Sequence, residues 1–331
     1  MTRADVLLVS LGGTLGLRDA DAELAASLRR AGAAVEVVEA ERVRELRTYA
    51  LIELAWAKAA RRAATRGIAD HDPRAIVYSS STAALLWPRP GAIRFDAPAA
   101  GNRPGRHGVW QRPVERRRMR ETSLLLPWSE GGLAEAPEPR ADALVVPVPV
   151  EPSGATPAER RGVVTYGANP RKKGLDRVLR AWAAARREGE VLTVAGLDAR
   201  AGGAYVRQHD LPAEGVSFAG ALDRVAYRAL VRGARAFVTA PRREDYGIAQ
   251  LEALADGTPL VTTPAPGPYA ALPLARSLDA RLVTDDLAAA IRVALDEPAA
   301  DYAVRATAAL SPWRRAAVDR LVADDLLKRL L

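Results

Sequence analysis

Two carboxylates, Glu244 and Glu252, lie eight positions apart in the stretch REDYGIAQLE. Glu244 falls among loop-forming residues, whereas Glu252 falls inside a segment that we expect to be helical from about Tyr246 or Gly247 onward. A carboxylate can accept hydrogen bonds from two neighbouring hydroxyls, so one Glu suits a ribose diol and the other suits the hydroxyls of a transferred sugar. The alternative is structural, because Glu252 could instead pair with a neighbouring Arg.

A group of cations follows the apolar strand pattern GVVTYG. Arg171, Lys172 and Lys173 fall in the loop and first helical turn that come next, and they suit the negative charge of a diphosphate. Three cations at a helix start oppose the helix dipole unless an anion is bound there. A solvated basic turn is the alternative interpretation.

Backbone amides offer two further places for negative charge. Gly12 and Gly13, in the stretch LGGTLG after the apolar run DVLLVS, let the backbone approach an anion at a helix start. The spacing lacks the third glycine of the G-x-G-x-x-G fingerprint, so an ordinary turn is an equal alternative. The amides of Tyr246, Gly247 and Ile248 lie at a second expected helix start and are placed to meet an anion as well.

Composition limits the function classes. The chain of 331 residues is about twice the usual length of one domain, and its 49% hydrophobic content suffices for two cores. It has no Cys and only three His, which excludes thiolate chemistry and leaves little for zinc, so no metal site is expected. The first apolar run is too short for a membrane span or a signal peptide, which favours a cytoplasmic location. The net charge of +8 indicates an anionic partner, or it merely reflects the base composition of the genome, since the chain is rich in Arg and Ala.

Short apolar runs alternate with helix-period segments along the whole chain, which predicts parallel α/β sheets. The stretch PVEPSGATPAERR marks a linker near residue 150, so we expect doubly wound domains over 1–150 and 151–310, followed by a tail at 311–331. We expect strands at 5–10, 33–41, 74–81, 92–98, 122–130, 143–150, 162–168, 190–196, 215–220, 235–241 and 258–264. We expect helices at 19–32, 45–67, 172–189, 223–234, 246–257 and 285–298, and a tail helix with Ala317, Leu321, Leu326, Leu327 and Leu330 near one side.

These motifs together resemble a known family. EDYGIAQLE followed by ALADGTPLVTT is similar to the E-x7-E motif, helix and strand of the retaining glycosyltransferases of family 4, and NPRKKGLD resembles their K-G-x-D segment. LGGTLGLRDADAELAASLRRAGAAVEVV resembles their opening glycine-loop unit. The resemblance implies the GT-B fold, in which two Rossmann-like domains face each other across a cleft. Residues 1–150 would form the acceptor side, completed by the helix at 311–331, and residues 151–310 would bind the donor.

Carried over residue by residue, the resemblance implies roles at both ends of the donor. Lys173 would contact the diphosphate with help from Arg171 or Lys172, Glu244 would lie near the donor sugar, and Glu252 would hold the nucleotide ribose. The amides of Tyr246, Gly247 and Ile248 would meet the sugar and phosphate, and Gly12 and Gly13 would close against the phosphates.

Two positions depart from the family pattern. Ala168 and Gly167 stand where an Arg usually partners the Lys on the diphosphate. The family often has a His at the end of an amino-domain strand, where this chain has Phe95 and Asp96. Asp96 could contact the donor sugar or the acceptor hydroxyl, or could cap a turn before Pro98.

The implied reaction is transfer of a hexosyl group from a nucleotide-diphosphate sugar to an acceptor hydroxyl with retention and without a metal or other cofactor. Lys173, a nearby Arg and helix-start amides would stabilise the leaving diphosphate. Alternatives on the same fold are a non-catalytic nucleotide-sugar-binding subunit, a phosphorylase or an epimerase.

Partners other than the donor are less defined. The stretch 102–121 has seven Arg against two Glu, and it suggests either peripheral contact with an anionic membrane or an ordinary solvated helix and linker, in which only Val114 and Met119 could serve as an apolar wedge. The acceptor could be a glycan, a lipid-linked group or a small molecule. A nucleic-acid partner is disfavoured, because no basic module with interleaved aromatic residues is visible.

Overall fold

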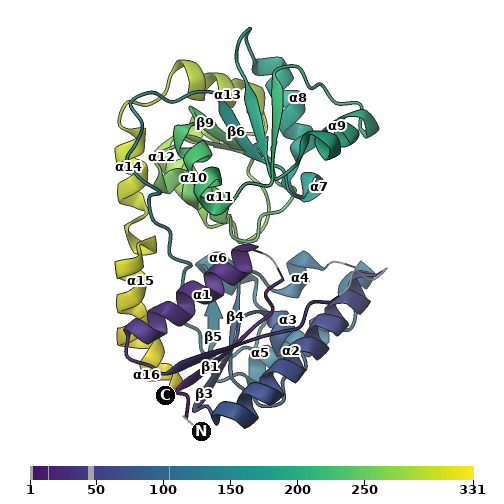
Figure 1. Ribbon diagram of the computed structural model, residues 1–331, viewed down its shortest axis with the longest axis vertical. Coiled ribbons are helices and arrows are strands. Elements are labelled where there is room, and N and C mark those ends of the chain that lie inside the picture. Colours follow the sequence, from purple (N-terminus) through teal and green to yellow (C-terminus); the bar gives the residue numbers. More distant parts are fainter. Residues whose placement is uncertain (1–2, 14, 44–47, 104) are drawn as a thin grey trace. The chain divides into compact units, whose positions relative to one another are not determined.

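A computed structural model describes residues 3–13, 15–43, 48–103 and 105–331. The chain divides into two compact units (Figure 1). Unit 1 comprises Met1–Pro149 and Trp313–Leu331, and unit 2 comprises Val150–Pro312. Each unit contains one five-stranded parallel sheet, which confirms the predicted class of two doubly wound α/β domains.

The sheet of unit 1 has the strand order β2-β1-β3-β4-β5. Strand β1, the second in this order, is buried along its whole length and pairs in parallel with both β2 and β3. The five strands are β1 (Val6–Ser10), β2 (Val35–Glu39), β3 (Ala75–Tyr78), β4 (Ala92–Phe95) and β5 (Leu125–Pro127).

Helices cover both faces of this sheet (Figure 1). Because side chains alternate along a strand, Leu7 and Val9 pack with the core on one face, whereas Val6 and Leu8 pack with the core on the other. The first face is covered by the long helix α2 and by α5, and the second by α1 and the C-terminal helices. The helices are α1 (Leu15–Arg30), α2 (Tyr49–His71), α3 (Ser81–Ala84), α4 (Ala99–Asn102), α5 (Gln111–Glu121) and α6 (Glu130–Glu135), with a 3-10 turn at Gly105–Gly108.

The chain after α6 departs from its prediction, because 143–150 is not a strand. Leu144 and Val146 donate backbone hydrogen bonds to Leu125 and Pro127 of β5, so the segment begins to pair with the sheet edge. Pro147 and Pro149 carry no N–H, and the ladder cannot continue past them. One isolated bridge, between Ala143 and Leu125, remains.

The C-terminal tail packs on unit 1 as several short helical pieces rather than as the single regular helix expected. The fully buried side chains are Val318, Val322 and Leu326, which join the core beside α1, whereas the expected core residue Ala317 is only partly buried. Asp319 accepts a hydrogen bond from Ser27 of α1 at 2.5 Å. The pieces are a 3-10 turn at Ser311–Trp313, α15 (Arg315–Leu321), a π-helical turn at Val322–Leu326 and α16 (Leu327–Leu330).

The sheet of unit 2 has the strand order β10-β9-β6-β7-β8, so β6 and β9 lie side by side at its centre. This order matters for function, because the loops that follow β6 and β9 emerge next to each other at the carboxyl edge, where sheets of this kind bind ligands. The strands are β6 (Val163–Tyr166), β7 (Leu192–Ala195), β8 (Val216–Gly220), β9 (Ala236–Thr239) and β10 (Leu260–Thr262).

Three helices of unit 2 were not predicted: α9, α12 and α14. In α9 the adjacent Gly202 and Gly203 lower the helix propensity, but a Cβ at Gly202 would collide with the ring of Phe218 in β8. Glycine is therefore needed for the close packing of α9 against the sheet. The helices are α7 (Pro170–Lys173), α8 (Leu175–Ala185), α9 (Ala199–Gln208), α10 (Arg224–Gly233), α11 (Ile248–Ala255), α12 (Ala271–Leu278), α13 (Leu287–Asp296) and α14 (Tyr302–Ala309), with a 3-10 turn at Ala280–Leu282.

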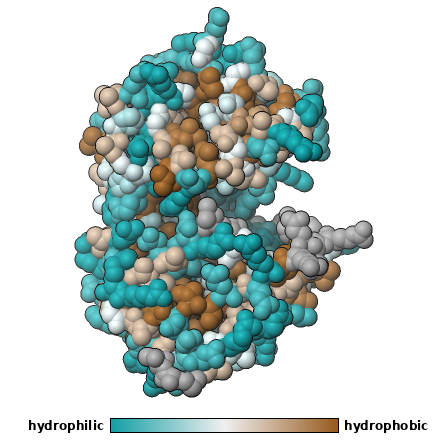
Figure 2. Space-filling view, viewed as in Figure 1, coloured by the Kyte–Doolittle hydropathy of each residue, from teal (hydrophilic) through white to brown (hydrophobic). Residues whose placement is uncertain are grey.

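The surface of the protein is mixed in polarity. Figure 2 shows hydrophobic groups interrupting a mainly hydrophilic or neutral surface on the visible face of each unit. Among the residues that the structure describes, no helix is long and apolar enough to cross a membrane.

Candidate functional site

The candidate site lies at the carboxyl edge of the unit 2 sheet, where the loops after β6 and β9 meet. The backbone N–H of Arg242 donates to the carbonyl oxygen of Lys172 at 3.1 Å, which joins the two loops directly. Gly174 makes this approach possible, because it has φ +64° and any Cβ there would collide with the carbonyl oxygen of Ala240. The glycine of the K-G-x-D segment is thus required by the close packing of the two loops.

Lys173 and Glu244 come together in this contact. The Nζ of Lys173 lies 2.8 Å from the Oε2 of Glu244, and the amide nitrogen of Gln250 donates to the same oxygen at 3.0 Å. The Glu244 side chain is 6% exposed and the Lys173 side chain 20% exposed. A buried carboxylate is thereby compensated by a cation and an amide, which leaves the cation partly accessible at the edge of the sheet.

Lys172 and Arg171 occupy different environments. The Nζ of Lys172 pairs with the Oδ2 of Asp245 at 2.9 Å, and Arg243 pairs with the other oxygen of Asp245 at 2.9 Å. Asp245 was not predicted as a site residue, and its carboxylate offsets the charge of Lys172. Arg171 is exposed and makes no ion pair with another described residue.

The turn before α11 requires a glycine. Gly247 has φ +89°, and a Cβ there would press against the ring of Tyr269 at 3.0 Å. Ile248 begins α11, so its amide lies in the first helical turn, where N–H groups lack a partner within the helix. Tyr246 is buried, and its carbonyl oxygen accepts the amide of Ala270 at 3.0 Å.

Glu252 lies in a separate arginine cluster. Its Oε1 is 3.0 Å from Arg224 and 3.3 Å from Arg228, both on α10. Arg228 is as deeply buried as Glu252, whereas the Arg224 side chain is 54% exposed. The structure therefore has the ion pair that the sequence analysis named as the alternative, and it brings Glu252 together with α10 rather than with Lys173.

Two tyrosines flank this cluster and were missed from the sequence. The rings of Tyr166, at the end of β6, and Tyr227, on α10, lie 5.6 Å apart in an edge-on arrangement. Burial raises the pKa of both phenols, and the negative charge of Glu252 raises them further. The position of Tyr166 directly after an apolar strand was the available signal.

In unit 1 the glycine loop is attached to a buried polar group. Gly12 has φ +59°, and its amide donates to the hydroxyl of Ser10 at 3.2 Å, while Gly13 is exposed. The Ser10 hydroxyl in turn donates to Asp21 at 2.5 Å. Burial raises the pKa of Asp21 although Arg94 lies 3.4 Å from it. None of these three partners was predicted.

Asp96 follows β4 at the carboxyl edge of the unit 1 sheet and is half-buried. Its Oδ1 accepts the backbone amide of Ala97 at 2.8 Å, which is the turn-capping contact named as one alternative. The structure describes each unit by itself, so Asp96, Gly12 and Gly13 belong to unit 1 and the remaining predicted residues to unit 2.

The basic stretch 102–121 is engaged with the protein at several points. Arg103 pairs with Glu53 at 2.6 Å, and Arg118 stacks over Trp87 and pairs with Glu121 at 2.8 Å. Met119 is fully buried in the core of unit 1 and cannot act as an apolar wedge for a membrane.

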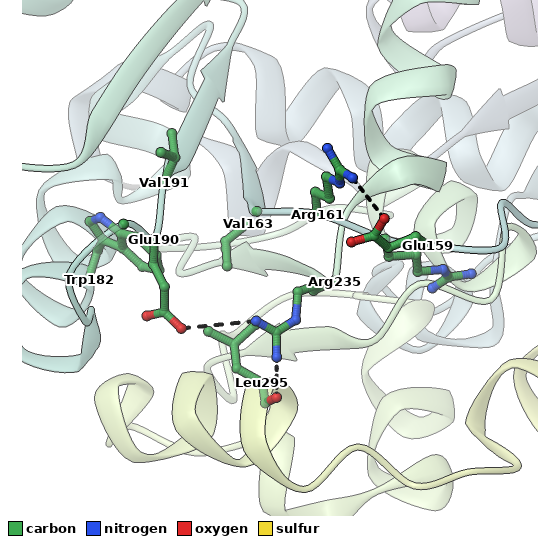
Figure 3. Close-up of a pocket in the computed structure, with 11 residues that line it drawn as sticks. Glu159, Arg161, Val163, Trp182, Glu190, Val191, Arg235 and Leu295 are labelled. Carbon is green, nitrogen blue, oxygen red and sulfur yellow. Dashed lines mark hydrogen bonds and ion pairs between the residues drawn. The ribbon is translucent and has the colours of Figure 1, made fainter.

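A cavity of about 400 Å³ lies at the opposite, amino edge of the unit 2 sheet (Figure 3). Arg235 donates to the carbonyl oxygen of Leu295 and lies 4.0 Å from Glu190 on its wall. None of the predicted site residues lines this cavity. In the described part of the chain, no three His, Asp or Glu side chains are grouped so that they could hold a metal ion.

Comparison with known proteins finds a similarity within unit 2. Residues 160–297 match the family model described as glycosyl transferases group 1. This part of unit 2 is therefore similar to a group 1 glycosyl transferase domain. The match contains every predicted site residue of unit 2, from Arg171 to Glu252. No curated protein matches the chain.

Solved structures resemble the whole chain and not only residues 160–297. Sucrose-phosphate synthase from Thermosynechococcus elongatus superposes with a TM-score of 0.76 at 15% identity, over 99% of both chains. Anabaena HepE, solved with UDP and glucose, gives 0.69 at 15% identity over 98% of this chain and 100% of its own. WaaG, a glycosyltransferase of lipopolysaccharide biosynthesis, gives 0.66 at 16% identity over 97% and 95%. The chain therefore has the GT-B fold.

Proposed function

We propose that the protein is a retaining glycosyltransferase that moves a hexosyl group from a nucleotide-diphosphate sugar to an acceptor hydroxyl. The carrying observation is that the domain matched over 160–297 joins Lys173 to Glu244 at the carboxyl edge of its sheet and places Glu252 on the helix that follows. The solved structure of HepE with UDP and glucose supports a nucleotide-sugar donor.

Lys173 is the proposed diphosphate contact. Its ammonium group lies at the point where β6 and β9 end, and it is anchored by Glu244 on one side. Arg171, exposed in the same turn, is the proposed second cation, since Lys172 is already paired with Asp245. Positive groups fixed before the reaction stabilise charge as it develops on the leaving diphosphate. The amides of Tyr246, Gly247 and Ile248 would add to this stabilisation.

Glu244 and Glu252 would hold hydroxyl groups. Glu244 would accept hydrogen bonds from hydroxyls of the donor sugar beside Lys173. Glu252, on helix α11, would accept hydrogen bonds from the two ribose hydroxyls. Gly12, Gly13 and Asp96 are the proposed contributions of unit 1, with the glycines against the phosphates and Asp96 toward the donor sugar or the acceptor. In this scheme leaving-group stabilisation dominates the rate, and neither Glu acts as a hydrolase nucleophile.

The test is a turnover assay monitored by NMR with UDP-, GDP- and ADP-hexoses, in which slow hydrolysis in the absence of acceptor is followed over time. We expect the α-linked donor that is consumed to release its sugar first as the α-anomer, and the same rate with and without EDTA. Release of the β-anomer would contradict retention, and loss of turnover with EDTA would contradict metal independence. Binding without turnover of any donor would favour a non-catalytic sugar-nucleotide-binding subunit.

A further inference from the structure

Arg228 connects Glu252 to a second buried carboxylate. Its guanidinium group donates to the Oε1 of Glu252 at 3.3 Å and to the Oδ2 of Asp256 at 3.0 Å. The side chains of Arg228 and Glu252 are 7% and 5% exposed, and that of Asp256 is fully buried. Because Glu252 on α11 and Asp256 at the C-cap of this helix lie one turn apart, a single planar guanidinium can reach both.

The same guanidinium also holds backbone atoms. Its Nη2 donates to the carbonyl oxygen of Glu252 at 3.4 Å and to that of Glu151 at 2.9 Å. Asp256 accepts the backbone amide of Ser153 at 2.6 Å and its hydroxyl at 3.0 Å. The arginine is therefore fixed by α11 and by the segment that leads into unit 2, and it has little freedom to move.

A carboxylate that must meet two vicinal hydroxyls needs a fixed orientation. Free rotation of a Glu side chain would have to be lost on binding, and this loss weakens the complex. Arg228 contacts both the carboxylate and the carbonyl oxygen of Glu252, so it restricts the side chain from both ends. Arg224 contacts the same carboxylate oxygen from a largely exposed position, where water competes with it.

We propose that Arg228 is the positioning residue for the ribose-binding carboxylate of Glu252, and that Asp256 fixes Arg228 for this purpose. The inference rests on the proposed function, since it assumes that Glu252 binds the ribose. A positioning role of Arg228 differs from a purely structural role in one measurable respect. A positioning role affects the recognition of the ribose hydroxyls, whereas a structural role affects all ligands of the domain alike.

The experiment measures calorimetric affinities of the full chain for UDP, GDP and ADP, and for the 2′,3′-dideoxy form of whichever one binds. The ratio of the two affinities reports the ribose contact. We expect Arg228→Lys, which keeps the charge but cannot reach all four acceptors, to lower this ratio about tenfold. Asp256→Asn should lower the ratio in the same direction, with the affinity for the dideoxy nucleotide unchanged in both variants.

Arg232→Lys is the matched control. Arg232 lies one turn along α10 and donates to the Ser153 hydroxyl at 2.9 Å, so it shares the structural contact without reaching Glu252. Its ratio should equal that of the wild type. Thermal melts check that each variant is folded, and Asp256→Asn retains the test if Arg228→Lys does not fold.

The possible failures are distinguishable. An unchanged ratio in folded Arg228→Lys or Asp256→Asn would overturn the positioning role alone. Equal affinity of the wild type for the ribose and dideoxy forms would remove the ribose role of Glu252 and this inference with it, but would leave nucleotide binding intact. No binding of UDP, GDP or ADP by the wild type would overturn the proposed function itself.

Discussion

Lys173 and Lys172 are neighbours in sequence but differ in what they can offer a ligand. Lys173 is 20% exposed and pairs with Glu244, which also accepts a hydrogen bond from Gln250, whereas Lys172 is 48% exposed and pairs with Asp245. Interactions of a partly buried cation with an anion are screened less than those of an exposed one. Lys173 should therefore contribute more than Lys172 to the affinity for the diphosphate.

We predict that Lys173→Met weakens the binding of a nucleoside diphosphate about tenfold or more, because a charged contact to the diphosphate is lost. The matched variant Lys172→Met should weaken it less, and both should leave the affinity for the nucleoside alone nearly unchanged. Isothermal titration with the diphosphate and the nucleoside measures both effects. Equal losses in the two variants would show that Lys173 has no special role.

Asp256 should matter for folding as well as for positioning. Removal of its carboxylate in Asp256→Ala leaves Arg228 buried without that counter-charge and Ser153 without its acceptor. We predict a loss of about 3 kcal/mol in the free energy of unfolding, measured by urea denaturation. Asp296→Ala, which removes an exposed pair with Arg187 and Arg292, is the control and should cost far less. A loss no larger than that of the control would contradict the account of the cluster.

At this scale the sequence predicted residue types better than partners. The two carboxylates and Lys173 were identified as candidates from their spacing and from a family resemblance, and their roles remain predictions. The contacts of Asp245, Gln250, Arg228 and Asp256 depend on which loops and helices meet, which local patterns do not encode. Glu252 has the arginine partners that the sequence analysis could name only as a general alternative.

Among the elements, the loop that contains Gly174 is the most constrained. Gly174→Ala would combine an unfavourable φ of +64° with a collision against the carbonyl oxygen of Ala240. Gly189 has φ +80° but open space around it, so Gly189→Ala isolates the cost of the backbone conformation, about 1 to 2 kcal/mol. We predict a clearly larger loss of unfolding free energy for Gly174→Ala in urea denaturation. Equal losses would mean that the two loops do not need their close approach.

Helix α5 contacts the start of α4 through the buried carboxyl group of Glu115. Both carboxylate oxygens of Glu115 accept the amide of Ala99, at 3.0 and 2.8 Å, at the start of α4. Burial raises the pKa of Glu115 in the folded chain, so the folded state retains this proton at pH values where the unfolded state has lost it. The contribution of Glu115 to stability therefore falls as the pH rises from the ordinary carboxyl range through the raised pKa.

We predict that Glu115→Gln removes this part of the pH dependence, because an amide keeps an acceptor for Ala99 and does not ionise. Thermal melts between pH 4 and pH 8 measure it. Glu121→Gln is the control on the same helix, since Glu121 is paired with Arg117 and Arg118 and has a lowered pKa. A decline with pH that is as steep in Glu115→Gln as in the wild type would contradict the prediction.

The elements themselves were predicted where apolar periodicity was strong. The ten strands of the described residues all fall within expected segments, because each is a short, mostly apolar run between loops. The false strand at 143–150 has the right apolar residues, but its prolines remove the donors that a ladder needs. Helix α9 was missed because Gly202, which packing against Phe218 requires, and its neighbour Gly203 lower the helix propensity of the segment.

For the whole molecule, the tail is part of the core of unit 1 although it lies at the other end of the sequence. Val318, Val322 and Leu326 are buried beside α1, and each such side chain contributes about 1.5 to 3 kcal/mol. Removing residues 314–331 should therefore lower the unfolding temperature of unit 1 strongly and leave unit 2 nearly unchanged. Calorimetry with two resolved transitions tests this, with Arg320→Ala, an exposed tail variant, as the control. An unfolding profile of the truncated chain that equals that of the full chain would contradict this prediction.

The fold class was predictable at this scale because strand and helix patterns alternate twice along the chain, and it is confirmed by the two parallel sheets. The division of the tail into several helical pieces was not predictable, because a π-helical turn at Val322–Leu326 shifts which residues face the core. Identity of the nucleotide base and of the acceptor depends on backbone groups and on contacts that no residue pattern in the chain specifies.

The central claim is that unit 2 binds a nucleotide-diphosphate sugar at the carboxyl edge of its sheet. Isothermal titration of UDP, GDP and ADP into the wild type and Glu252→Gln tests it most directly. We predict that one of the three binds at micromolar strength and that the substitution weakens this binding about tenfold, equivalent to about 1.4 kcal/mol. Absence of binding by all three nucleotides would contradict the claim.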